Sequence, residues 1–132
     1  MKAMSLRTQR RNEFLDITHE VSKAVSESGQ TEGVAVVYVP HTTAGVTINE
    51  NADPSVVHDI LLTLEELVPH LRSGYRHSEG NSDSHVKASV VGPSVTIPFE
   101  GGRLQLGTWQ GVYFCEFDGP RYRHFMVQVV GV

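Results

Sequence analysis

The sequence predicts an α+β fold, a single compact domain in which antiparallel or mixed β-sheet layers pack with two to three helices. Its 132 residues have room for one hydrophobic core and too little for two domains, so we treat residues 1–132 as one domain. β-prone runs lie near both ends of the chain and helical patterns lie between them. This order is typical of α+β proteins.

The first third of the chain predicts two short strands, a helix and a buried strand. The two strands fall within residues 5–17. Apolar residues then repeat at helical intervals, Thr18 can cap this helix, and Gly29 lies where a helix C-terminus favours glycine. Residues 33–39 form an almost continuous apolar, β-prone run, which is typical of a buried strand.

The middle third predicts a strand, a long helix, a loop and a short helix. Residues 44–48 are β-prone. Asp53 and Pro54 form a strong helix start, because the carboxylate accepts from free N–H groups and proline is tolerated at the first helical position. One apolar face follows, up to Pro69. Residues 70–84 are polar and predict a long loop, after which Asp83 can cap a helix over 84–91.

The last third is β-prone throughout. We expect strands over 94–99, 103–106, 112–118 and 122–130, with turns at 100–102 and 119–120. If residues 119–120 form a two-residue turn, Asp118 faces Arg121 and Glu116 faces Arg123 on one face of a hairpin. The apolar residues Val112, Phe114, Phe125 and Val127 continue that face.

Composition excludes several classes of protein. The net charge of −4 gives no basic excess, so we expect no nucleic-acid partner. No apolar run approaches the roughly 18 residues that cross a bilayer, so we expect no membrane association. Cys115 is the only cysteine and is expected to be a packed apolar residue in a cytoplasmic protein. Seven histidines stand beside only three lysines, and this ratio calls for an explanation.

Histidines supply the first candidate site. His77 and His85 flank a flexible polar stretch and can converge on one divalent metal, with His41 as the third ligand, because neutral imidazole is the commonest protein ligand for zinc. Asn81 and Asp83 lie between His77 and His85 and could support the ligands. The spacing is also compatible with an ordinary polar loop that carries exposed histidines.

A second candidate cluster follows His41. Within thirteen residues the chain offers hydroxyls, an amide and two carboxylates: Thr42, Thr43, Asn49, Glu50 and Asp53. The threonines are also good β-formers, and Asp53 is also a helix cap.

A third candidate site combines the predicted hairpin with an aromatic corner. Arg121 and Arg123 could bind a phosphate or diphosphate bidentately, or could form simple ion pairs with the facing carboxylates. Trp109, the only tryptophan, lies between glycines beside Gln110 and could cover a ring or fill a corner of the core.

The order of these motifs resembles the YjbQ-like family, whose members are described as secondary thiamine-phosphate synthases. Ser84 departs from the pattern, since the family more usually has alanine there. The resemblance covers nearly the whole chain and rests on the following segments: HTTAG at 41–45, NE at 49–50, DP at 53–54, YRH at 75–77 with Asn81, Asp83 and His85, GTWQ at 107–110 and EFDGPRYR at 116–123.

The resemblance implies a compact α+β fold, a homotrimer with polar clefts between subunits, and a thiamine-phosphate synthase activity. That reaction joins a pyrimidine-methyl diphosphate to a thiazole phosphate and releases diphosphate. Glu50, Asp53, Glu116 and Trp109 would then be catalytic, with Glu50 or Glu116 as the base and Trp109 stacked on the pyrimidine. The substrate would contact Thr42, Thr43, Asn49, Asn81, Gln110, Arg121 and Arg123.

The expected cofactor is a divalent metal on His41, His77 and His85. Zinc or another transition metal fits three histidines best, although magnesium is the usual partner of diphosphates. This mismatch favours a second interpretation, metal-dependent hydrolysis of a phosphorylated small molecule. A third interpretation is a non-catalytic trimeric binding protein, in which the same polar residues hold the subunits together.

Overall fold

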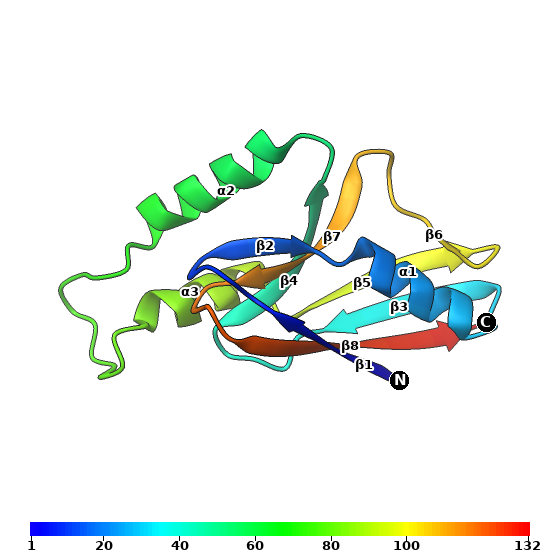
Figure 1. The fold of residues 1–132 in the computed structure, drawn as a ribbon, viewed down its shortest axis with the longest axis horizontal. Coiled ribbons are helices and arrows are strands. Elements are labelled where there is room, and N and C mark those ends of the chain that lie inside the picture. The colour runs from blue at the N-terminus through cyan, green and yellow to red at the C-terminus, as the bar shows by residue number, and fades with distance from the viewer.

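Two antiparallel sheets form the frame of the molecule in a computed structural model that describes residues 1–132 (Figure 1). The five-stranded sheet has the order β1 (Lys2–Arg7), β8 (Tyr122–Gly131), β3 (Glu32–Tyr38), β5 (Ser94–Glu100) and β6 (Arg103–Leu104). The three-stranded sheet has the order β2 (Glu13–Asp16), β7 (Gln110–Glu116) and β4 (Ala44–Glu50). With the helices α1 (Thr18–Glu27), α2 (Pro54–Leu67) and α3 (Ser82–Val91), these sheets confirm the predicted α+β class.

The main core lies where α1 and the inner faces of both sheets meet. Alternate residues of β3 are buried and the residues between them are more exposed, as expected for a strand with one covered face. Val21 and Val25 bring the apolar face of α1 onto the sheets, and Phe114 and Phe125 meet from β7 and β8 with ring centres 6.3 Å apart. Burial of each such side chain contributes about 1.5–3 kcal/mol.

The start of α1 differs from the sequence prediction. Thr18 does not cap the helix but is its first residue, and its backbone N–H donates to the carboxylate of Asp16 at 2.9 Å. The Thr18 hydroxyl instead accepts a hydrogen bond from the backbone N–H of Val112. It therefore ties α1 to β7.

Helix α2 begins as predicted but packs loosely. The Asp53 carboxylate accepts from the backbone N–H of Ser55 at 2.9 Å, and proline takes the first position. No residue of α2 is buried, and the helix stands apart from the sheets (Figure 1). Only Val57 and Leu64 pack against a small second core, and Leu67 is 73% exposed. Much of the predicted apolar face is therefore uncovered within one chain.

Helix α3 begins two residues before the predicted start. Asp83 is not a cap but a buried residue of the first turn, because the chain enters the helix at Asn81. The helix packs closely on β4 at Gly45, where a Cβ atom would lie 2.6 Å from the carbonyl oxygen of Gly92. Glycine is required there by this approach.

The predicted C-terminal hairpin is wrong. Strands β7 and β8 belong to different sheets, and the chain crosses from one to the other between Glu116 and Tyr122. A Cβ on Gly119 would lie 2.2 Å from the carbonyl oxygen of Arg10, so the crossing is pressed against the segment after β1. The four apolar residues of the predicted face are nevertheless buried, since both strands face the same core. None of the three helices is both long and apolar enough to cross a bilayer.

Candidate active site

His77 and His85 lie together at the N-terminal end of α3. His85 projects from the first turn of this helix and His77 from the loop before it, and their ring centres are 5.3 Å apart with the planes at 86°. Both rings line a hollow of about 350 Å³, together with Ser82 and Val86. Because the His77 side chain is 43% exposed, the pair is open to ligands from solvent.

His41 lies on the other side of His85. The two histidines line an adjoining hollow of about 340 Å³ that also includes Thr42 and Ser89. The structure therefore brings His77 and His85 together and places His41 next to them, but no group of three or more histidine, cysteine or acidic side chains is arranged around one metal position.

The His41 ring contacts a histidine that the sequence had not marked for chemistry. The rings of His41 and His124 have centres 4.8 Å apart, and Nε2 of His41 lies 3.1 Å from the backbone oxygen of His124. Burial, followed by the charges of Arg123 and His124, lowers the pKa of His41. His41 is therefore neutral at neutral pH. Its Nε2 either donates to the backbone oxygen of His124 or accepts from the backbone N–H of His124, also at 3.1 Å, and only the first tautomer leaves the Nδ1 lone pair free for a metal.

Glu116 and Arg123 form a closed ion pair. The Glu116 side chain is fully buried and Arg123 is 4% exposed. One carboxylate oxygen accepts from Nε of Arg123 and from the hydroxyl of Thr8, both at 2.8 Å, and the other accepts from Nη2 of Arg123 and the backbone N–H of Asp118. Burial alone raises the pKa of Glu116, but these hydrogen bonds outweigh it and hold the pKa below its ordinary value.

These contacts bear on two predicted roles. The pairing of Glu116 with Arg123 is as predicted, although it joins two sheets instead of closing a hairpin. Both oxygens of Glu116 already accept hydrogen bonds, and Arg123 donates to Glu116 and to buried Thr43. Both side chains are almost fully buried in this chain, and their catalytic and phosphate-binding roles remain predictions.

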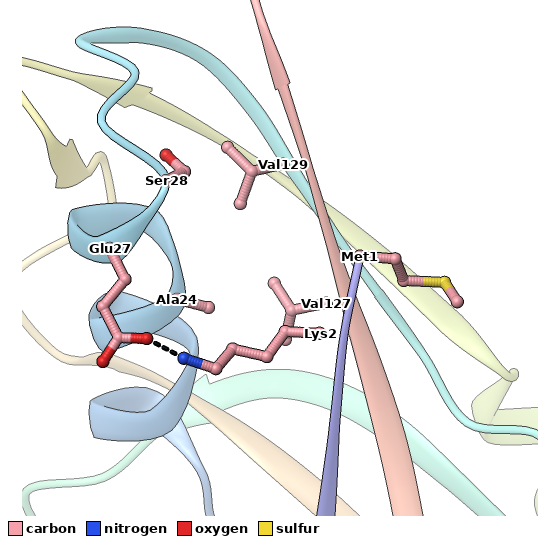
Figure 2. Close-up of a pocket in the computed structure, with 7 residues that line it drawn as sticks. All are labelled: Met1, Lys2, Ala24, Glu27, Ser28, Val127 and Val129. Atoms are coloured by element: carbon pink, nitrogen blue, oxygen red, sulfur yellow. Dashed lines mark ion pairs between the residues drawn. The ribbon is translucent and has the colours of Figure 1, made fainter.

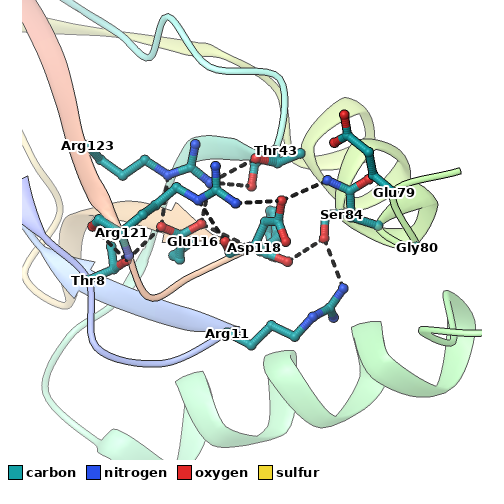
Figure 3. A network of polar contacts seen from close by, with 12 residues as sticks. Thr8, Arg11, Thr43, Glu79, Gly80, Ser84, Glu116, Asp118, Arg121 and Arg123 are labelled. Atoms are coloured by element: carbon teal, nitrogen blue, oxygen red, sulfur yellow. Dashed lines mark hydrogen bonds and ion pairs between the residues drawn. The ribbon is translucent and has the colours of Figure 1, made fainter. Parts of the chain in front are cut away.

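Arg121 keeps guanidinium N–H groups that do not bond within the chain. It bonds Asp118 at 3.0 Å, as predicted, and remains half exposed (Figure 3). Asp118 also accepts from the side-chain amide of Asn81 at 2.8 Å. The amide oxygen of Asn81 is buried and has no hydrogen-bond partner in the chain. This open end of the polar network lies at the start of α3, in the same region as the histidine pair.

Sequence reasoning missed a buried charge network beside the site. Asp83 accepts two hydrogen bonds from the Arg11 guanidinium and a third, at 3.3 Å, from Lys87, whose side chain is 1% exposed. Lys87 also bonds Glu65 of α2 at 2.8 Å. The spacing of Asp83 and Lys87, four residues apart on one helix, was a readable signal for an ion pair. No local pattern pointed to Arg11.

The remaining predicted residues lie at the far end of β4. Glu50 pairs with Gln110 in the sheet register, and Trp109 beside them is 63% exposed. The seven residues of β4 span about 20 Å, because an extended strand rises about 3.3 Å per residue. The cluster predicted after His41 is therefore divided between the two ends of this strand.

Side chains at this far end are partly occupied by local contacts. Asp53 caps α2, and its bonds from Ser55 lower the pKa of its carboxyl. Asn49 accepts from the backbone N–H of Glu50, and Gln110 accepts from that of Gly107. Asn49, Asp53, Trp109 and Gln110 are nevertheless exposed, and Glu50 is half-buried.

A further hollow lies far from these residues, between β1, β8 and α1 (Figure 2). It measures about 370 Å³ and is bounded by an ion pair between Lys2 and Glu27. Its lining contains no histidine, and it includes none of the predicted site residues.

The fold and the histidine site together describe a small α+β protein in which histidine side chains are accessible to ligands where a loop enters a helix. Comparison with known proteins makes this specific: the family described as "UPF0047 protein YjbQ-like" matches residues 2–132. The chain belongs to the YjbQ/UPF0047 family.

Relatives in two domains of life support this assignment. The chain is 55% identical to UPF0047 protein MJ1081 of Methanocaldococcus jannaschii, over 96% of this chain and 91% of the relative. It is 50% identical to UPF0047 protein YugU of Bacillus subtilis, over 99% of each. A YjbQ/UPF0047 crystal structure from Clostridium acetobutylicum has a TM-score of 0.97 at 54% identity and covers 98% of this chain and 100% of that one. None of these names states a reaction, so activity is argued from the site.

Proposed function

We propose that this chain is a metal-dependent enzyme that acts on a phosphorylated small molecule at His77 and His85. One observation carries the proposal. Two imidazoles that bind one tetrahedral zinc ion at about 2.0–2.1 Å have ring centres about 5 Å apart, and the ring centres of His77 and His85 are 5.3 Å apart. His41, which is neutral, lines the adjoining hollow with His85 and is a further imidazole beside the pair.

The reaction implied by the YjbQ resemblance is thiamine-phosphate synthesis, in which diphosphate leaves the pyrimidine-methyl carbon as the thiazole nitrogen attacks. A bound divalent ion would neutralise charge on the phosphate oxygens. Arg121 is the half-exposed guanidinium near the start of α3 that can bind the leaving diphosphate, held by Asp118. Asn81 fixes Asp118 in turn, so it acts on the substrate through Arg121.

Hydrolysis of a phosphorylated small molecule is the second candidate, and the chemistry of the donor set favours it. Imidazole nitrogens suit zinc and other transition metals, whereas magnesium prefers carboxylate and water oxygens. Imidazoles and hydroxyls line the two hollows, and no carboxylate does. A metal of this kind, held by His77 and His85, would supply activation of water, which hydrolysis requires and synthesis does not.

We further propose the homotrimer that the resemblance implies, with the site shared between subunits. Two observations support it: α2 leaves apolar residues such as Leu62 and Leu67 exposed, and Glu50 and Trp109 lie a full strand length from the histidines of their own chain. In a trimer, one subunit's Glu50 and Trp109 can complete the hollow of another. We place the protein in the cytoplasm, where the free Cys115 stays reduced.

A turnover screen tests the proposal. Phosphate or diphosphate release is measured over phosphorylated metabolites, and from the pyrimidine-methyl diphosphate with and without thiazole phosphate, in the presence of zinc or of a chelator. We expect release that the chelator abolishes and that His77→Ala and His85→Ala both lack. The matched control is His58→Ala, an exposed histidine of α2 outside the hollows.

The same screen separates the alternatives. Release that requires thiazole phosphate identifies the synthase, and release without it identifies a hydrolase. If the wild type releases nothing and the histidine variants instead lose their trimeric mass in light scattering, the protein is a non-catalytic trimer and the enzyme proposal is wrong.

A further inference from the structure

We infer that the loop between α2 and α3 forms a phosphate-binding pocket, in which Arg72 holds the phosphate group of a monoester whose organic part extends toward His77. This inference rests on the proposed function, since it names where the phosphate of the substrate binds. It assigns a role to Arg72 and Tyr75, which the candidate site does not include.

The pocket is a hollow of about 440 Å³, within the usual range for small-molecule sites. His77 and Ser82 line both this hollow and the one that holds the histidine pair, so the two hollows adjoin. A ligand held by Arg72 would therefore extend toward His77. The polar residues that line it are His70, Arg72, Tyr75, His77 and Ser82.

The lining carries positive charge without a carboxylate. No aspartate or glutamate lines the hollow, and the only acidic contact to a lining residue is Glu79, 3.6 Å from Nε2 of His77 and 71% exposed. An anion that enters is therefore attracted and meets little repulsion.

Arg72 differs from the arginines of the neighbouring network. Arg11, Arg121 and Arg123 each bind a carboxylate. The Arg72 guanidinium instead lies over the Tyr75 ring, 5.6 Å from its centre, and only its Nε bonds within the chain, weakly, to the oxygen of Ser73. Stacking positions the guanidinium and leaves both terminal nitrogens free, which is the arrangement that binds phosphate bidentately.

The loop that carries Arg72 is closed on itself. Nε2 of His70 lies 2.9 Å from the carbonyl oxygen of Gly80 and donates to it, so this bond joins the two ends of the loop. The Tyr75 hydroxyl donates to the oxygen of Pro69 at 3.4 Å. Gly80 has φ of 74°, a conformation that favours glycine and turns the chain into α3. His70 is thus a positioning residue, and the pocket exists before a ligand arrives.

Titration with phenyl phosphate on metal-free protein in chelator tests the pocket directly. Binding is followed by calorimetry, with inorganic phosphate and benzoate as the other ligands, and we expect phenyl phosphate to bind more tightly than benzoate. Arg72→Gln should weaken phenyl phosphate binding at least about tenfold, because it removes the charge-assisted hydrogen bonds to the phosphate.

Arg76→Gln is the matched control, since Arg76 is exposed, carries the same charge and does not line the hollow. Its affinity should stay within about twofold of the wild type, because Arg76 does not line the hollow and an exposed charge is screened by salt. The inference is overturned if the wild type shows no saturable binding, if Arg72→Gln binds as the wild type does, or if Arg76→Gln loses as much.

This experiment fails independently of the enzyme proposal because it contains no metal and no turnover. Loss of binding in Arg72→Gln together with an inactive, metal-free wild type would keep the pocket and refute the enzyme. Turnover that depends on His77 but has an unchanged KM in Arg72→Gln would refute the pocket and keep the enzyme.

Discussion

Two pairs of ionisable side chains differ in their surroundings. Glu116 and Arg123 are buried, and each oxygen of the carboxylate accepts two hydrogen bonds. His77 is exposed and His85 is half-buried, and their rings stand edge to face beside a hollow that is open to solvent. The sequence marked all four for chemistry. The difference teaches that partners, more than residue type, decide whether a polar side chain can bind a ligand.

The largest expected effect comes from breaking the buried pair. Glu116→Ala leaves Arg123 buried without its counter-ion, and such a change costs about 3–5 kcal/mol of unfolding free energy. Urea denaturation measures it. The double variant Glu116→Met with Arg123→Met should recover most of the loss, because it buries no unpaired charge. If the single and double variants lose equal amounts of unfolding free energy, the loss does not come from an unpaired buried charge and the explanation is contradicted.

Acid should weaken the same pair. The folded pKa of Glu116 lies below its ordinary value of 4.5, so its contribution to stability is complete above about pH 4.5 and is lost as the pH falls through the folded pKa. Asp83 adds to this trend: although burial raises its pKa, bonds from Arg11 and Lys87 bring it below the ordinary value. Urea midpoints between pH 7 and pH 3 should fall less steeply in Glu116→Gln than in the wild type, and parallel curves would contradict this.

A smaller effect is expected at the half-exposed pair. Arg121→Ala removes an ion pair whose guanidinium is 50% exposed, so the free energy of unfolding should change by less than about 1 kcal/mol. Affinity for diphosphate should nevertheless fall if Arg121 binds the leaving group. If Arg121→Ala lost as much unfolding free energy as Glu116→Ala, Arg121 would contribute to stability as a buried ion pair does, and this prediction would be wrong.

Local sequence signals predicted the elements well and their assembly less well. The cap at Asp53 and the alternation in β3 depend on neighbours in sequence, and both are found in the structure. The hairpin failed because a turn at 119–120 does not reveal that the next strand joins another sheet.

The candidate site was predictable to the same extent. The predicted pairing of Glu116 with Arg123 is present although the two residues lie in different sheets. Glu116 is the last residue of β7 and Arg123 lies near the start of β8, so the crossing between the strands brings them together. Burial of that pair and the roles of Arg11 and Arg72 depend on contacts distant in sequence or on the shape of a loop, and no spacing rule encodes them.

Zinc binding by the histidine pair tests the central claim most directly. In calorimetric titration of metal-free protein, the wild type should bind one zinc ion per chain, and His77→Ala and His85→Ala should each weaken it at least about tenfold, because each removes one of few ligands. His58→Ala should bind as the wild type does. The unfolding free energies of metal-free His77→Ala and His58→Ala should stay within about 0.5 kcal/mol of the wild type, as expected for exposed side chains. Zinc binding that is absent in the wild type, or unchanged in His77→Ala and His85→Ala, would contradict the account.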